Sequence, residues 1–215
     1  MSDVSVLATL ARHVVTPVVR EADAERAREV VAALREGGLR VFEVTLSVPG
    51  AIDLVAELAR DADLTVGVGT VLSGADAARA VEAGARFVVS PAALPEVAGA
   101  AHAGGAAAVL GALTPTEVVA ARVAGADAVK VFPAGSVGGP SHVKALRSVL
   151  PGVPLIPTGG VDLSNLRDYL AAGVHSVGVG GALSPPAVSD APDLARRYLE
   201  VARAFAPSSG GAPDP

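Results

Sequence analysis

The sequence contains no cysteine, no tryptophan and a single methionine. Without cysteine there is no disulfide framework, no thiolate metal ligand and no cysteine nucleophile. Aromatic residues make up only 3% of the chain, although 51% of it is apolar. The core must therefore consist of Ala, Val and Leu in regular packing.

Basic clusters and long apolar runs are absent as well. The net charge is −5 and no block of Lys and Arg appears, so neither nucleic acid nor an anionic membrane surface is an expected partner. No run approaches the roughly 18 apolar residues of a membrane span, and the N-terminus lacks the pattern of a secretory signal. We therefore expect a cytoplasmic protein.

Metal-binding side chains are thinly spread. The histidines His13, His102, His142 and His175 form neither an i, i+4 pair nor a cluster with carboxylates, and those are the patterns typical of metal sites. The sequence therefore predicts no metal ion, and nothing in it calls for an organic cofactor.

Short apolar segments alternate with amphipathic helices along the chain. We predict strands at residues 14–19, 41–45, 65–70, 87–90, 106–110, 128–132, 154–158 and 176–180. We predict helices at residues 24–36, 51–60, 74–83, 95–103, from 115 onward, 141–150, 165–172 and 192–205. The clearest helix start is Thr114-Pro115-Thr116-Glu117, a capping box with Pro at the first helical position.

This alternation predicts an α/β fold, a single-domain parallel (β/α)8 TIM barrel over residues 1–205. A short lead-in helix is expected at residues 5–12, and the Pro-, Gly- and Ser-rich segment 206–215 is expected to be a disordered tail. A doubly wound open sheet is the alternative.

One lysine stands where cations are costly. Lys130 lies in the stretch from Ala128 to Ala134, which is otherwise apolar on both faces of a short strand. Burial disfavours the ammonium and favours the neutral amine, which is a nucleophile. The alternative is a lysine at a strand end that reaches water along its stem.

An internal repeat connects Lys130 with Glu43. A Gly-apolar-x-apolar motif begins at Gly38, Gly84, Gly125 and Gly173, just before the even-numbered strands, with a small residue in the last position of the fourth copy. Glu43 and Lys130 stand at the same offset from their glycines, so both are expected to point into the barrel at one height. A lone Glu on an apolar strand is usually ion-paired or solvated, but a Glu and a Lys matched in register predict a reactive pair.

The layer predicted from this register holds Glu43, Val89, Lys130 and Gly178. Since Gly178 has no side chain, we expect a void beside the charged pair, which a small substrate could fill. Polar residues also end the predicted strands, at Arg20, Thr45, Thr70, Ser90 and Thr158. Barrel enzymes keep their active sites at this end.

Two glycine pairs follow the last two strands, Gly159-Gly160 and Gly180-Gly181. Backbone without side chains lets N–H groups approach an anion, and these two loops are where such barrels commonly bind phosphate. Glycine is also common in turns, yet pairs at both loops favour a site for phosphate or another anion.

Six strings in the chain resemble the 2-keto-3-deoxy-6-phosphogluconate (KDPG) and 4-hydroxy-2-oxoglutarate aldolases. They are Phe42-Glu43-Val44-Thr45, Gly67-Val68-Gly69-Thr70-Val71, Val89-Ser90-Pro91, Thr114-Pro115-Thr116-Glu117, Val129-Lys130-Val131-Phe132-Pro133-Ala134 and Pro157-Thr158-Gly159-Gly160-Val161. The strings follow the order of the family over nearly the whole chain, which makes the resemblance specific.

The resemblance implies a cofactor-independent class I aldolase of the Entner-Doudoroff pathway that is a homotrimer. It implies that Lys130 forms a Schiff base with a 2-keto acid and that Glu43 moves protons. It further implies that Thr70, Phe132 and Thr158 line the pyruvate pocket, and that Gly159, Gly160 and Gly180 bind phosphate. With Thr45 and Gly181 from the strand ends and loops, these complete the predicted site.

The chain departs from the family pattern at three positions. Ser47 stands where some members carry Arg, so Arg20 is expected to bind the substrate carboxylate. Leu110 replaces a Pro, and Gly181 replaces a Ser, which predicts a weaker hold on phosphate. Two other functions stay open, namely a phosphosugar isomerase or synthase that uses Lys130 and Glu43 without covalency, and a non-catalytic phosphometabolite-binding barrel.

Overall fold

The computed structural model describes the backbone of residues 3–205 and the side chains of residues 6–205. The predicted tail at 206–215 lies outside the described residues. Within them, no helix is both long enough and apolar enough to cross a membrane.

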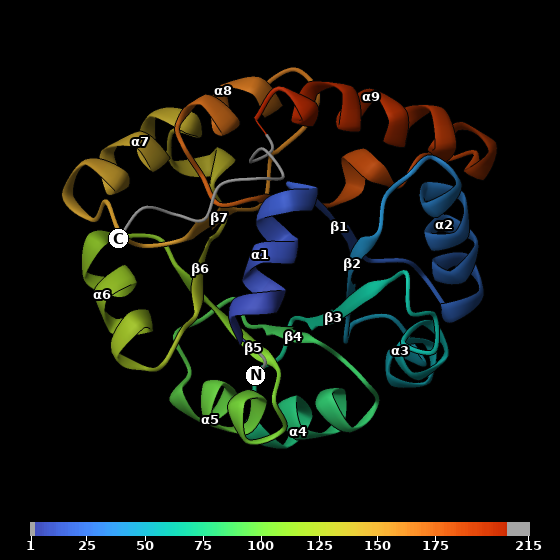
Figure 1. Cartoon of the computed structure of the whole chain (residues 1–215), viewed down its shortest axis with the longest axis horizontal. Coiled ribbons are helices and arrows are strands. Elements are labelled where there is room, and N and C mark those ends of the chain that lie inside the picture. The colour runs from blue at the N-terminus through green and yellow to red at the C-terminus, as the bar shows by residue number, and fades with distance from the viewer. Residues whose placement is uncertain (1–2, 206–215) are drawn as a thin grey trace.

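The strands form one parallel sheet that closes into a barrel (Figure 1). They are β1 (Val15–Val19), β2 (Val41–Thr45), β3 (Thr65–Gly69), β4 (Phe87–Val89), β5 (Ala107–Ala112), β6 (Ala128–Val131), β7 (Leu155–Pro157) and β8 (Val177–Val179). Hydrogen-bonded neighbours follow sequence order from β1 to β7, and β8 pairs with β1. A parallel bridge between Thr158 and Gly178 joins β7 to β8. The open-sheet alternative is therefore wrong.

Helices cover the barrel, and those that lie between consecutive strands in the sequence connect them (Figure 1). They are α1 (Asp3–His13), α2 (Ala24–Glu36), α3 (Ala51–Leu58), α4 (Gly74–Glu82), α5 (Pro95–Ala103), α6 (Pro115–Val123), α7 (Pro140–Val149), α8 (Leu166–Ala171) and α9 (Ala191–Arg203), with short 3₁₀ turns η1 (Gly135–Val137), η2 (Gly181–Leu183) and η3 (Val188–Asp190). The predicted capping box is present at the start of α6, where Thr114 and Glu117 exchange side-chain and backbone hydrogen bonds.

Strand β5 is longer than the sequence predicts. It runs to Ala112, and Gly111 pairs with Lys130. A Cβ at Gly111 would lie 2.0 Å from the backbone oxygen of Pro91. The glycine is therefore explained by the close approach of the chain that follows β4.

The hydrophobic core has two parts. The larger part lies between the sheet and the helices, and its members are mostly Val, Ala and Leu. The smaller part fills the barrel interior, with Val41, Phe87, Val89, Ala107, Val109, Ala128 and Ile156 from strands and Val6 and Leu10 from α1.

Helix α1 lies across the barrel in Figure 1 and closes its N-terminal end. Leu10 is only 2% exposed and lines the same inner cavity as Glu43 and Lys130. Nε2 of His175, next to β8, lies 2.9 Å from the backbone oxygen of Leu7. The lead-in helix is therefore part of the barrel interior.

We expect Leu10→Ala to lower the free energy of unfolding by about 2–5 kcal/mol, because it leaves a cavity where the interior is otherwise filled. Chemical denaturation followed by circular dichroism measures the change. Val149→Ala is the control, since Val149 is 63% exposed and little change is expected there. Equal effects of the two substitutions would show that α1 does not seal the interior.

Candidate active site

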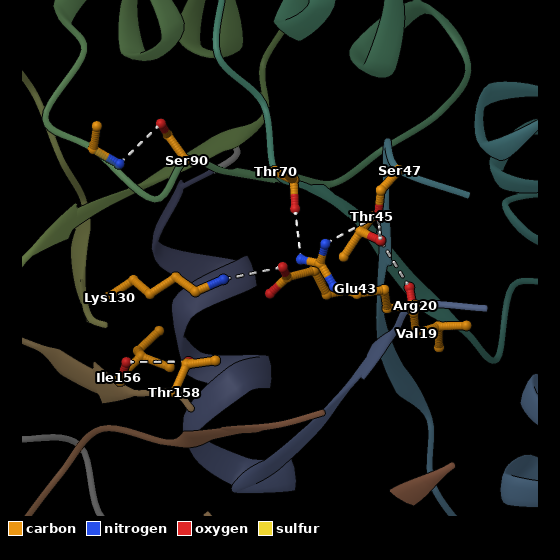
Figure 2. A network of polar contacts seen from close by, with 11 residues as sticks. Val19, Arg20, Glu43, Thr45, Ser47, Thr70, Ser90, Lys130, Ile156 and Thr158 are labelled. Atoms are coloured by element: carbon orange, nitrogen blue, oxygen red, sulfur yellow. Dashed lines mark hydrogen bonds and ion pairs between the residues drawn. The ribbon is translucent and has the colours of Figure 1, made fainter. Parts of the chain in front are cut away.

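The barrel interior contains a buried ion pair. Lys130 from β6 and Glu43 from β2 extend toward each other, and Nζ of Lys130 lies 3.2 Å from Oε1 of Glu43 (Figure 2). The two residues are 6% and 4% exposed. Both side chains point inward from opposite strands, as the register of the repeat predicts.

The predicted layer is also present, with one correction. Glu43, Val89, Lys130 and Gly178 all line one small inner cavity. The space at Gly178, however, is not a void for substrate, because a Cβ there would lie 2.3 Å from Oγ1 of Thr158. The glycine makes room for the side chain of Thr158 from the neighbouring strand. The expectation of a void at Gly178 was wrong because the side chain of Thr158 fills the space.

Above this layer, a cavity of about 550 Å³ opens among the loops that follow the strands. Lys130 lies in its wall together with eight other predicted site residues, which are Arg20, Thr70, Phe132, Thr158, Gly159, Gly160, Gly180 and Gly181. Glu43 is not in this wall and contacts it through Lys130. Most of the predicted residues thus belong to a single site in which a buried amine faces a substrate-sized space.

Arg20 is held at the rim of this cavity by two hydroxyl groups. Nη1 of Arg20 donates to Oγ of Ser47 at 3.1 Å, and Nη2 donates to Oγ1 of Thr70 at 3.1 Å (Figure 2). Side chains on strands β2 and β3 or just beyond them thus orient the guanidinium from one side. The other N–H groups can still bind a planar anion such as a carboxylate.

Thr45 has a different place from the one predicted. It is fully buried and does not line the cavity. Its hydroxyl bonds to the backbone oxygen of Val19 and, at 2.8 Å, to Oγ of Ser47. Thr45 therefore contacts Ser47 and, through it, Arg20, rather than the cavity itself.

Thr70 is held in an unusual backbone conformation. Its φ is +61°, in the left-handed region that β-branched residues rarely adopt. The turn it makes after β3 brings its hydroxyl to the guanidinium of Arg20. Strain of this kind persists only where the surrounding structure holds it, and it is concentrated at functional sites.

The far wall of the cavity is formed by the glycine loops after β7 and β8. A Cβ at Gly180 or at Gly181 would meet no atom within 4 Å, so both positions face open space. Asp162 also lines this wall. Hydrogen bonds from the side chain and backbone of Ser164 lower the pKa of the Asp162 carboxyl, so it is ionised at neutral pH.

Sequence reasoning missed several residues of the wall, namely Val18, Pro91, Val161, Asp162 and Ala182. Pro91, Val161 and Asp162 lie within two residues of the predicted positions Ser90 and Gly160, and this nearness in sequence is the signal that indicates them. Ser90 is one of the predicted polar strand ends, but it does not line the cavity. Its hydroxyl accepts a hydrogen bond from the backbone N–H of Ala92.

This arrangement suits covalent chemistry on a carbonyl compound. An amine at the bottom of a pocket can add to a carbonyl carbon, and a carboxylate at hydrogen-bond distance can take up and return protons. Phe132 adds an aromatic wall, with its ring centroid 5.5 Å from Nζ of Lys130. Among residues 6–205, no group of three or more His, Asp or Glu side chains is arranged to hold a metal ion.

Comparisons with known proteins agree with this geometry. A family model described as KDPG and KHG aldolase matches residues 6–198. A probable 2-dehydro-3-deoxy-6-phosphogalactonate aldolase of Rhizobium meliloti is 38% identical, over 90% of this chain and 92% of its own. A 2-dehydro-3-deoxy-phosphogluconate aldolase of Treponema pallidum is 36% identical, over 86% and 89%.

Solved structures are similar as well. The crystal structure of KDPG aldolase from Legionella pneumophila, with pyruvate captured as a covalent carbinolamine intermediate, has a TM-score of 0.77 and 30% identity. The match covers 94% of this chain and 98% of that one.

Proposed function

The chain belongs to the KDPG and KHG aldolase family, and we propose that Lys130 forms the Schiff base and Glu43 transfers the protons in its reaction. The chain is a class I aldolase that cleaves 2-keto-3-deoxy-6-phosphogluconate reversibly to pyruvate and glyceraldehyde 3-phosphate. The observation that supports the residue roles is the 3.2 Å contact between the two side chains at the bottom of the cavity. Neither a non-covalent isomerase or synthase nor a non-catalytic barrel is favoured.

The first half of the reaction uses the amine. Lys130 Nζ, once deprotonated, adds to the C2 carbonyl of the keto acid and forms a carbinolamine. Loss of water then gives a protonated imine. Glu43 is the nearest base and acid to Nζ, so it takes the proton from the amine and protonates the departing hydroxyl, directly or through water.

The second half breaks the carbon–carbon bond. A proton leaves the C4 hydroxyl for Glu43, the C3–C4 electron pair moves into the imine to give an enamine, and the aldehyde departs. The enamine carbon C3 then takes a proton, and water hydrolyses the imine to release pyruvate. The proposal assigns these proton transfers to one carboxylate, and the position of Glu43 at 3.2 Å from Nζ supports it.

Substrate binding divides between the two ends of the cavity. Arg20 binds the C1 carboxylate, Thr70, Phe132 and Thr158 enclose the pyruvate part, and the backbone N–H groups of the glycine loops bind the phosphate. 4-Hydroxy-2-oxoglutarate is a second candidate substrate because it shares the pyruvate half.

The biological setting is part of the proposal. A place in the Entner-Doudoroff pathway, a cytoplasmic location and a homotrimer stay predictions from the sequence and its resemblance. Exposed apolar side chains of Leu72, Val119 and Val123 are consistent with an interface between copies of the chain.

Reductive trapping tests the covalent step. The chain has two lysines, Lys130 and the exposed Lys144, so a pyruvate adduct can be located without ambiguity. With pyruvate and borohydride we expect an adduct at Lys130, found by intact mass and peptide mapping. Lys130→Met should lose the adduct and the cleavage activity, because the nucleophile is gone while an apolar stem remains.

Lys144→Met is the matched control for this experiment and should keep both the adduct and the activity. Circular dichroism checks that both variants are folded. Substantial cleavage activity in folded Lys130→Met would contradict the assignment of the Schiff base.

Arg20→Lys tests the carboxylate site. A lysine keeps the positive charge but loses the planar fork that can bind a carboxylate through two N–H groups. We expect KM for the keto acid to rise about tenfold with little change in kcat, since this contact is made equally in the ground and transition states. Steady-state kinetics measure both values. Arg28→Lys, at a surface ion pair with Glu57, should change neither value, and an unchanged KM in Arg20→Lys would exclude the proposed role.

Gly181→Ser tests the phosphate site. The position has open space and no left-handed backbone, so a serine fits without strain. Its hydroxyl should donate one charge-assisted hydrogen bond to phosphate, worth about 1.5–3 kcal/mol when well aligned. We therefore expect KM for the phosphorylated substrate to fall by roughly tenfold or more.

Gly181→Ala separates the hydroxyl from the added Cβ and should leave KM unchanged. KM for 4-hydroxy-2-oxoglutarate should also change little, because this substrate has no phosphate. Equal effects of Gly181→Ser on both substrates would show that the loop after β8 does not bind phosphate.

A further inference from the structure

The side chain of Glu43 reaches Lys130 by crossing strand β3. In the register of the sheet, Glu43 is opposite Gly67, whereas Gly69 is opposite Thr45. The carboxylate nevertheless lies against Gly69, one inward position nearer the open end of the barrel. A Cβ built on Gly69 would lie 1.9 Å from Oε1, 2.6 Å from Cδ and 2.7 Å from Cγ of Glu43.

These distances are far below a van der Waals contact. The three atoms nearest to a methyl group on Gly69 all belong to the side chain of Glu43. The backbone of Gly69 is not in the left-handed region, so the missing Cβ is not explained by conformation. What the glycine provides is the space that the catalytic carboxylate occupies.

We propose that Gly69 is a positioning residue, whose lack of a side chain lets Glu43 lie across β3 at 3.2 Å from the amine of Lys130. The inference rests on the proposed function, because it assigns a role to Gly69 through the proton transfers of Glu43. Any side chain at this position must displace the side chain of Glu43, since the atoms nearest to the added Cβ belong to it and none belongs to the backbone.

Proton transfer can be measured apart from cleavage. Pyruvate alone forms the imine with Lys130, loses a proton from its C3 methyl group to give the enamine, and takes one back from the base. In heavy water this cycle replaces the methyl protons with deuterium. The exchange rate reports on the carboxylate, whereas the final extent of borohydride trapping reports on imine formation alone.

We expect Gly69→Ala to slow this exchange by about 10- to 100-fold, since a misplacement near 1 Å has effects of that size. The extent of pyruvate trapping at Lys130 after long incubation should match that of the unchanged protein. Glu43→Gln should slow exchange by roughly 10²- to 10⁴-fold. Adding Gly69→Ala to Glu43→Gln should then change the rate by less than about twofold, because no functional carboxylate is left to misplace.

The control is Gly99→Ala, a glycine-to-alanine change in α5 where a Cβ meets no atom within 4 Å. It should leave exchange and trapping unchanged. If Gly69→Ala does not fold, the double variant Gly69→Ala with Glu43→Ala removes the clash and should fold as well as Glu43→Ala alone, which also leaves Lys130 without its ion-pair partner.

Three results would overturn the inference. They are exchange within about twofold of normal in Gly69→Ala, an equal loss in the normal and Glu43→Gln backgrounds, and failure of the double alanine variant to fold where Glu43→Ala alone folds. Failure of the unchanged protein to trap pyruvate would overturn the proposed function as well, so the two failures are distinguishable.

Discussion

The site depends on one physical constraint, which is that two opposite charges are buried together inside an apolar barrel. Removing an ion from water costs several kcal/mol, and a single buried charge would be strongly destabilising. Lys130 and Glu43 offset this cost for each other at 3.2 Å. The pair must also be kept from bulk water, and Leu10 of α1 closes the interior from below. Without this closure, water would reach the pair from below and screen its charges. Helix α1 therefore helps to keep the ion pair buried.

Glycines shape the interior around the pair. Gly67, Gly69 and Gly178 each leave space that a side chain from a neighbouring strand fills, namely Phe87, Glu43 and Thr158 in that order. In a barrel with so few aromatic residues, the functional side chains are thus fixed by strand backbone rather than by bulky neighbours. Glu43 and Lys130 themselves lie on strands β2 and β6, and positions on regular elements suit precise geometry better than positions on loops.

The sequence predicts the fold and the charged pair well, for reasons that are local or periodic. Strand and helix positions follow from apolar alternation and helix caps, and the repeat predicts that Lys130 and Glu43 share a layer. It does not predict the direction in which a side chain leans once inside. The predicted void at Gly178 and the predicted place of Thr45 in the cavity both depend on side-chain direction. The structure differs from the prediction at both positions for this reason. The contacts of Arg20 with Ser47 and Thr70 join three separate strand ends, and nothing in linear spacing indicates them.

The two ends of the cavity differ in what lines them, which are buried side chains around Lys130 and backbone groups at the glycine loops. Around Lys130, buried side chains contact one another, so a substitution there disturbs several partners at once. At the far wall, the glycine loops offer backbone groups and open space, and Gly180 and Gly181 have no neighbouring side chain that must move. Asp162 adds a negative charge to this wall, which opposes a phosphate, while the backbone N–H groups favour it. A single substitution in this wall can change the balance between repulsion by Asp162 and attraction by the backbone N–H groups without any effect on the buried pair. The aldehyde half of the substrate can therefore diverge among related chains while the pyruvate half and its chemistry stay the same.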